Sequence, residues 1–158
     1  MIMQRISNQT KVVLFPDNYQ EQAYITKEKC IAVQHYSYTL QRNRNAYGEP
    51  YGRISGSAVT LTIRVGSRDS LRLFYQRLTQ HYSSTYSLLF DATYDAQGYL
   101  TDQSGALIVE GYVVDVQELF DRDQANEEGE QMSLVCEILL TSFSCVGMNH
   151  LLKETFSN

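Results

Sequence analysis

Apolar and polar residues alternate with a period of two along several stretches of the chain, and the clearest one covers residues 53–65. Its two faces are formed by Val59, Leu61, Ile63 and Val65 on one side, and by Ala58, Thr60, Thr62 and Arg64 on the other. A period of two is typical of a strand that has one buried face. We therefore predict a half-buried strand that begins near Arg53.

Other stretches have strand character as well, and some are apolar on both faces. Residues 27–29 are expected to form a bend or bulge, and Gly111 marks a bulge or a close backbone approach. Strands with two apolar faces indicate a closed barrel, a sandwich, or a sheet covered by another copy. The predicted strands are residues 11–15, 23–40 in two parts, 53–65, 85–94, 106–120 and 131–143.

One stretch has helical periodicity instead, and Ser67 or Asp69 is a suitable N-cap for it. A single helix among many strands is expected to cover a sheet edge or an open barrel end. The predicted fold is thus mainly β: a distorted antiparallel barrel or sandwich of six to seven strands, with one α-helix and a long protruding loop. The apolar face of the helix comprises Leu71, Phe74, Tyr75, Leu78 and Tyr82.

The protruding loop, residues 41–53, separates a strand that ends at about Leu40 from the strand that begins near Arg53. It is polar and basic, and it contains Gly48 and Pro50. It is too long for a two-residue hairpin turn, and a long ordered loop in a compact domain usually has a function. We expect this loop to leave the domain and contact a neighbouring copy.

Length and composition fit one soluble domain over residues 1–158. Residues 1–10 are expected to be a loose N-terminal arm, and residues 145–158 a C-terminal tail. The chain has 12 tyrosines and no tryptophan. Tyrosine suits half-hydrated strands and interfaces, because its ring packs while its hydroxyl stays in water.

The net charge of −5 argues against nucleic acid as the main partner. Residues 41–80 hold seven arginines and two acids, whereas residues 115–130 hold seven acids and one arginine. This asymmetry fits two solvated faces, or head-to-tail self-association between a basic and an acidic surface. The candidate residues of a self-assembly interface are Arg42, Arg44, Tyr47, Gly48, Glu49, Pro50, Tyr51, Arg53, Glu127 and Glu128.

The sequence contains no pattern that supports catalysis, a cofactor or a metal. His35, His81 and His150 lack metal-ligand spacing. The three cysteines do not form a ligand pattern, and Cys136 is expected in the core. A nucleophile elbow and a phosphate-binding glycine pattern are also missing. We therefore expect a protein that is not an enzyme.

Residues 1–10 lack the apolar segment of a signal peptide, and no apolar run reaches transmembrane length. We expect a protein that is made in the cytoplasm and does not insert into membranes. Any export would use a route without a cleavable leader.

Short motifs follow one another in a characteristic order: Tyr36-Ser37-Tyr38, Gly48-Glu49-Pro50, Gly52, Ser55-Gly56 and the strand around Leu61. They are followed by a helix, a strand and a long strand through Gly111-Tyr112-Val113-Val114. The motif Glu118-Leu119-Phe120 and a final strand near Met132 come last. Over about residues 11–145 this order resembles the haemolysin-coregulated protein family, the tube proteins of type VI secretion, and most of all its Bacteroidetes branch. Two positions depart from the family pattern. The loop Asp of the family is Arg44 or Asn45 here, and Glu49 replaces the usual Arg before Pro50.

The resemblance implies a barrel with one helix that assembles into a hexameric ring. Such rings stack into a tube, carry effectors in the lumen, and are expelled by a contracting sheath together with a spike protein. The protein would then be cytoplasmic before assembly and secreted on contraction.

Two other functions remain open. One is a tail-tube or baseplate protein of a phage-like particle, which shares the fold. The other is a monomeric barrel that binds a small molecule in a closed pocket. That pocket would be lined by Tyr36, Tyr38, Tyr86 and Tyr112.

Overall fold

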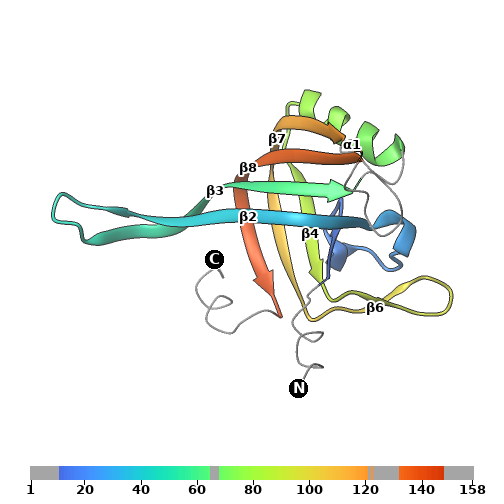
Figure 1. Ribbon diagram of the computed structural model, residues 1–158. Coiled ribbons are helices and arrows are strands. Elements are labelled where there is room, and N and C mark those ends of the chain that lie inside the picture. The colour runs from blue at the N-terminus through green and yellow to red at the C-terminus, as the bar shows by residue number, and fades with distance from the viewer. Residues whose placement is uncertain (1–10, 65–67, 121, 123–131, 148–158) are drawn as a thin grey trace, which may run out of the picture.

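The computed structural model describes residues 11–64, 68–120, 122 and 132–147. Six strands close into an antiparallel barrel in the order β1-β2-β3-β8-β7-β4, and β5 and β6 form a separate two-stranded sheet (Figure 1). This confirms the predicted fold class. The elements are β1 (Val12–Phe15), two 3₁₀ helices (Tyr19–Glu21 and Lys27–Lys29), β2 (Ile31–Arg44), β3 (Pro50–Arg64), α1 (Arg68–Thr79), β4 (Ser84–Phe90), β5 (Thr93–Tyr94), β6 (Leu100–Asp102), β7 (Gly105–Phe120) and β8 (Met132–Val146).

Alternate residues of the barrel strands fill its interior. Val59, Leu61 and Ile63 of β3 have no exposed surface, which confirms the predicted inward face. Val65, predicted on the same face, lies outside the described residues. Cys136 of β8 is buried in the same cluster, as expected. The barrel is therefore a packed core and not a channel.

Helix α1 lies alongside β7 and covers one end of the barrel (Figure 1). Phe74 is fully buried and its ring stacks on that of Tyr86 in β4, with 6.4 Å between the ring centroids. Tyr82 was expected on this apolar face, but it lies beyond the helix and is 67% exposed. Asp69 lies inside α1 and is therefore not its N-cap, and Ser67 lies outside the described residues. In the described part of the chain, no helix is both long enough and apolar enough to cross a membrane.

Several predicted boundaries are wrong, and the largest error concerns the loop at residues 41–53. Strand β2 continues to Arg44 instead of ending at about Leu40, and β3 begins at Pro50 instead of near Arg53. The loop is therefore a β-hairpin in which residues 45–49 form the turn. Residues 41–44 are polar on both faces, so hydrophobic alternation stops although strand pairing continues.

The remaining corrections are smaller. The bend predicted at residues 27–29 is a 3₁₀ helix. Residues 23–26 were predicted as the first part of the strand over residues 23–40, but among them only Thr26 forms a β-bridge. The strand expected over residues 85–94 is divided at Asp91, whose φ is 51°. Strand β8 runs to Val146, so the predicted tail begins too early. The N-terminal arm and residues 148–158 lie outside the described residues, and the single-domain boundary stays a prediction.

Gly111 in β7 shows why a glycine is needed at that position. The pairing of β7 with β8 shifts register between Glu110 and Gly111. A Cβ atom at Gly111 would lie 2.2 Å from the carbonyl oxygen of Leu139. The predicted close approach at Gly111 is confirmed, while the extra residue of the register shift is Thr141 of the neighbouring strand β8.

Candidate assembly surfaces

The outer part of the β2–β3 hairpin projects away from the barrel body (Figure 1). Strand β3 pairs with β8 over residues 58–64, so residues 50–57 have β2 as their only strand neighbour within the described chain. Within the described residues, β2 pairs with β1 only at Ile31 and Ala32, far from the tip of the hairpin. At about 3.3 Å per residue the unsupported segment extends roughly 25 Å. A two-stranded hairpin is marginally stable by itself in water, which makes this one a candidate for contacts with another chain.

Asn45 organises the tip of the hairpin. Its side-chain Oδ1 accepts hydrogen bonds from the backbone N–H groups of Tyr47, at 2.9 Å, and Glu49, at 3.0 Å. Its own backbone N–H donates to the carbonyl of Glu49, at 2.9 Å. Gly48 has a φ of 81°, which glycine adopts without steric cost. The tip is therefore a defined turn.

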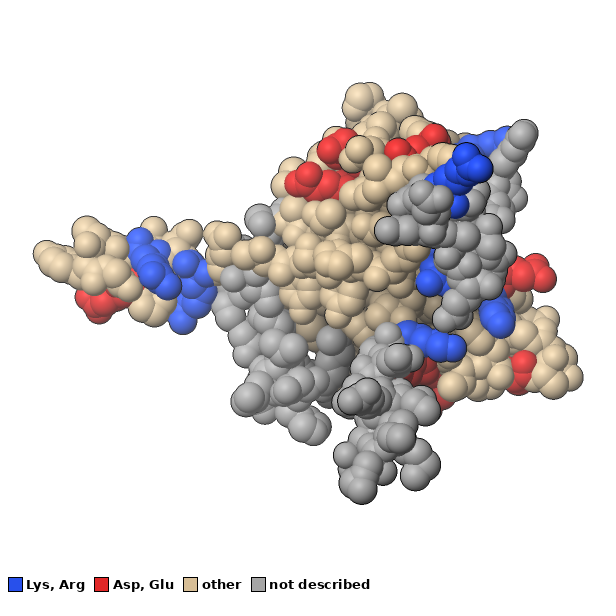
Figure 2. All heavy atoms as spheres, in the orientation of Figure 1, with Lys and Arg blue, Asp and Glu red and all other residues tan. Residues whose placement is uncertain are grey.

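The side chains of the tip face water. Tyr47 is 88% exposed and Tyr51 is 51% exposed. Arg42, Arg44 and Glu49 are exposed too, and Figure 2 shows these basic and acidic groups on the projecting arm. Aromatic residues and arginine are enriched in protein interfaces. The exposed tip thus has the composition of an interface.

The structure brings together most of the residues predicted for self-assembly. Arg53 contributes its backbone to β3, and nothing is described of its side chain. Glu127 and Glu128 lie outside the described residues, so their pairing with the arginines of another copy stays a prediction. The residues gathered on the hairpin are Arg42, Arg44, Tyr47, Gly48, Glu49, Pro50 and Tyr51.

A second candidate surface lies on the outer face of the barrel, and we call it the outer patch: Ala58, Tyr112, Val114 and Leu139. Leu139 of β8 lies between Ala58 of β3 and Tyr112 of β7 in the strand register. Tyr112 is 37% exposed, Val114 47% and Leu139 48%. Contiguous exposed apolar side chains mark interaction sites. Strand β8 is therefore apolar on both faces: Cys136 and Ile138 lie in the core, and Leu139 lies on the outer face.

Only part of the predicted acidic segment is described. Asp115 and Glu118 are exposed on β7. The Tyr75 hydroxyl of α1 donates a hydrogen bond to Glu118 Oε1 at 2.8 Å. That bond raises the pKa of Tyr75 above its ordinary value. Glu118 thus has a partner within its own chain.

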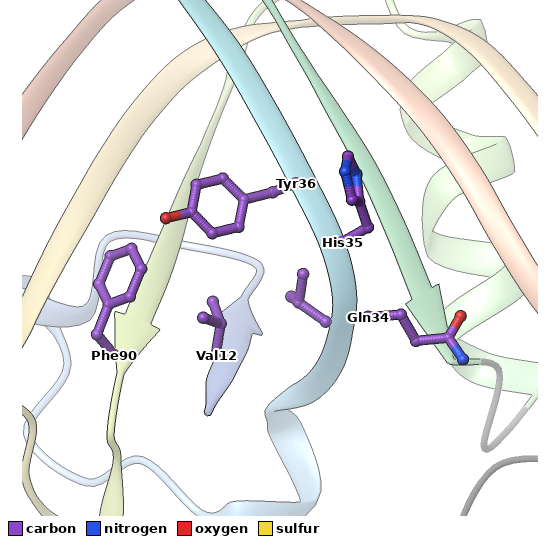
Figure 3. A pocket seen from close by; sticks show the side chains of 6 residues that line it. Val12, Gln34, His35, Tyr36 and Phe90 are labelled. Carbon is purple, nitrogen blue, oxygen red and sulfur yellow. The ribbon is translucent and has the colours of Figure 1, made fainter. Parts of the chain in front are cut away.

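A hollow of about 450 Å³ lies beside β1, the short strand between β2 and β4 (Figure 3). The ring of Tyr36 faces that of Phe90, with 5.8 Å between the centroids. The side chains of Gln34 and His35 project to the other side of β2. The lining residues are Val12, Val33, Gln34, His35, Tyr36 and Phe90.

The four tyrosines expected around a ligand pocket do not meet. Tyr86 is buried against Phe74 in the core, whereas Tyr112 belongs to the outer patch. Tyr36 stacks on Tyr38, with 6.3 Å between their ring centroids. The arrangement predicted for a ligand-binding barrel is therefore wrong.

The described residues contain no group of three or more His, Cys, Asp and Glu side chains that could hold a metal ion. His35 and His81 are exposed, and His150 lies outside the described residues. All three cysteines are free thiols. Burial raises the pKa of Cys136 to about 12, so this thiol stays protonated and unreactive at neutral pH.

No protein-family model matches the sequence, and no curated protein is similar to it in sequence. Solved structures, in contrast, share its architecture. An Hcp protein aligns over 87% of this chain and 90% of its own, with a TM-score of 0.60 and 13% identity. Hcp1 from Flavobacterium johnsoniae aligns over 87% and 95%, with a TM-score of 0.55 and 17% identity. A structure described as a type six secretion system protein aligns over 87% and 83%, with a TM-score of 0.58 and 10% identity.

The chain has the Hcp fold. Hcp stands for haemolysin-coregulated protein, so the resemblance predicted from short motifs is confirmed at the level of architecture. At 10–17% identity, most residues of this chain differ from those at the aligned positions of these structures. Its assembly surfaces must therefore be derived from its own residues.

Within this Hcp-fold chain, the sequence reasoning missed the outer patch. Ala58 was expected on one face of its strand, but nothing in the sequence joins it to Leu139 or Tyr112. That row depends on the register shift at Gly111, which moves β7 by one position along β8. The alternation of Leu139 with the buried Ile138 was the available signal.

Proposed function

We propose that this protein is a structural subunit of a type VI secretion tube, in which six copies form a ring and the rings stack head to tail. The fold of the chain is that of Hcp proteins over 87% of its length, and one similar structure is described as a type six secretion system protein. The observation that carries the proposal is the projecting hairpin on this barrel. In its projecting part, β2 and β3 have no strand neighbours but each other within the described chain.

In the ring, the outer patch packs against a neighbouring subunit. A cyclic ring uses two different surfaces on each subunit, so Tyr112, Val114 and Leu139 meet a surface unlike their own. Each of these side chains is already more than half buried in the single subunit, so burying the rest of one contributes roughly 1 kcal/mol. The barrel face turned to the viewer in Figure 2 has an uncharged centre, as suits a surface close to other subunits.

Between rings, the hairpin reaches the next copy. Single exposed charge pairs contribute about 0–1 kcal/mol, so Arg42 or Arg44 alone holds little. A ring repeats each contact around its circumference, and this multivalency makes the stack stable. Glu127 and Glu128 are one candidate acceptor for these arginines.

The other partners follow from this role: effector proteins in the lumen, a spike protein at the end of the tube, and the contractile sheath around it. The protein is cytoplasmic before assembly and is exported without a signal peptide when the sheath contracts. It binds no nucleic acid and does not insert into membranes. A tail-tube or baseplate protein of a phage-like particle would also form rings. The similar structure described as a type six secretion system protein favours the secretion tube.

Replacement of Leu139 by Asp tests the ring. It places a charge in the outer patch, and the expected result is a single subunit in sedimentation velocity where the unchanged protein forms rings. Negative-stain images should show rings for the unchanged protein only. Tyr82→Asp is the matched control, because it also replaces an exposed apolar side chain by a charge but lies outside the patch. A single-subunit sedimentation coefficient for the unchanged protein at every concentration would refute the proposal.

A further inference from the structure

A second projecting surface lies on the side of the barrel away from the β2–β3 hairpin (Figure 1). It consists of the β5–β6 hairpin and the segment that precedes β2. Tyr24 is 77% exposed and Tyr99 is 40% exposed. Their rings meet edge to face, with centroids 5.9 Å apart and an angle of 62° between the planes. We call this pair, with the backbone that holds it, the tyrosine platform.

Backbone hydrogen bonds fix the tyrosine platform. Tyr99 forms a β-bridge with Thr26, and the N–H of Leu100 donates to the carbonyl of Ile25 at 2.7 Å. The N–H of Tyr99 also donates to Asp95 Oδ1, at 2.9 Å. Ile25 itself is buried, in a core cluster with Phe15 and Leu89. Two exposed rings on a rigid base resemble the aromatic anchors that dominate binding energy at interfaces.

The charges around the two projections are complementary. Residues 11–30 and 91–104, the two segments that contain Tyr24 and Tyr99, hold six acids and three lysines, a net charge of −3. Residues 41–53 of the hairpin hold three arginines and one glutamate, a net charge of +2. Figure 2 shows basic groups on the arm, and acidic groups with basic groups beside them at the opposite end of the molecule. Such complementarity steers association and fixes orientation.

We infer that the tip of the β2–β3 hairpin docks on the tyrosine platform of the next copy, with Tyr47 and Tyr51 against Tyr24 and Tyr99. This inference rests on the proposed function, since it names the surface that receives the hairpin during stacking. The two projections point to opposite sides of one subunit, so they meet only between copies. A contact between two different surfaces generates an open-ended stack when the rotation between copies does not close into a ring.

Cysteine cross-linking tests this contact. The variant Tyr47→Cys, Tyr99→Cys carries one new thiol on each projection. Under mild oxidation it should form a ladder of covalent oligomers longer than dimers on non-reducing gels. Tyr47→Cys, Tyr82→Cys is the control, because Tyr82 is more exposed than Tyr99 but lies outside the platform, and this variant should stay monomeric. The unchanged protein sets the background from its own three cysteines.

A third variant, Tyr47→Cys, Glu127→Cys, separates the two possible acceptors. A ladder from this variant and none from the Tyr99 variant would overturn the platform and restore the acidic segment as the acceptor. Stacked rings in negative-stain images with no ladder from the Tyr99 variant would also overturn the platform, while the tube proposal stands. If the protein forms neither rings in negative-stain images nor a cross-linked ladder, the proposed function itself is refuted.

Truncation of the platform gives an independent readout. Tyr24→Ala with Tyr99→Ala should raise the protein concentration needed for stacking at least ten-fold and leave single rings intact. An unchanged thermal midpoint shows that the barrel has folded. Normal stacking by this folded variant would contradict the inference.

Discussion

The two halves of β3 have similar backbone pairing with β2 but very different neighbours. Over residues 58–64 the strand pairs on both edges, and Val59, Leu61 and Ile63 are fully buried. Over residues 50–57 it pairs with β2 alone within the described chain, and Tyr51 is half exposed. The inner half is stabilised by the barrel itself, whereas the outer half offers its surface to another chain. One strand thus serves folding at one end and assembly at the other.

The largest difference between the two regions should appear when an aromatic ring is removed from each. Phe74→Ala leaves a cavity beside Tyr86 and should lower the free energy of unfolding by about 3–5 kcal/mol. Tyr47→Ala removes an exposed ring from the hairpin and should change it by less than about 0.5 kcal/mol. Urea unfolding followed by circular dichroism, at concentrations where subunits are separate, measures both. Equal losses would erase the distinction between body and arm.

A methyl group added to a glycine in each region should give a smaller contrast. Gly111→Ala places a Cβ against the backbone oxygen of Leu139 and should cost about 1–3 kcal/mol of unfolding free energy. Gly48→Ala meets open space, so its cost is the strain of a φ of 81°, about 1 kcal/mol. That strain should speed hydrogen exchange at the tip and leave the barrel's thermal midpoint unchanged. A midpoint lowered as much by Gly48→Ala as by Gly111→Ala would count against an independent arm.

The core should also respond to alkaline pH. Burial raises the pKa of Tyr86 and of Cys136 to about 12, from ordinary values near 10 and 8.5. Both groups are neutral when protonated, so the unfolded chain loses these protons at lower pH than the folded one. Stability should be complete below about pH 8.5 and fall as the pH rises towards 12. Cys136→Ala should reduce the slope of that fall in urea titrations, and an unchanged slope would show that this thiol does not contribute.

The sequence predicted the elements whose side chains alternate against a core. Val59, Leu61 and Ile63 identified the inner half of β3, and Phe74 identified α1. The same reasoning failed over residues 41–44 and 50–53, because their strand conformation depends on pairing with each other and not on a buried face. A polar stretch of this kind looks like a loop in any pattern of hydrophobicity.

The candidate surfaces divide in the same way. The hairpin was predicted to project because its composition is local information: arginines, tyrosines and Gly48 lie close together in the sequence. The tyrosine platform was not predicted, because Tyr24 and Tyr99 meet through the bridge between Thr26 and Tyr99. Contacts between distant segments depend on register, which side-chain periodicity does not determine.

Deletion of residues 45–51 is the most direct test of the division between body and arm. The shortened protein should keep the thermal midpoint of the full chain, form single rings in negative-stain images, and show no stacked rings at any concentration. Sedimentation velocity should give one ring-sized species. Stacks of normal length from the shortened protein, or a barrel that no longer folds, would contradict the assignment of the arm to assembly.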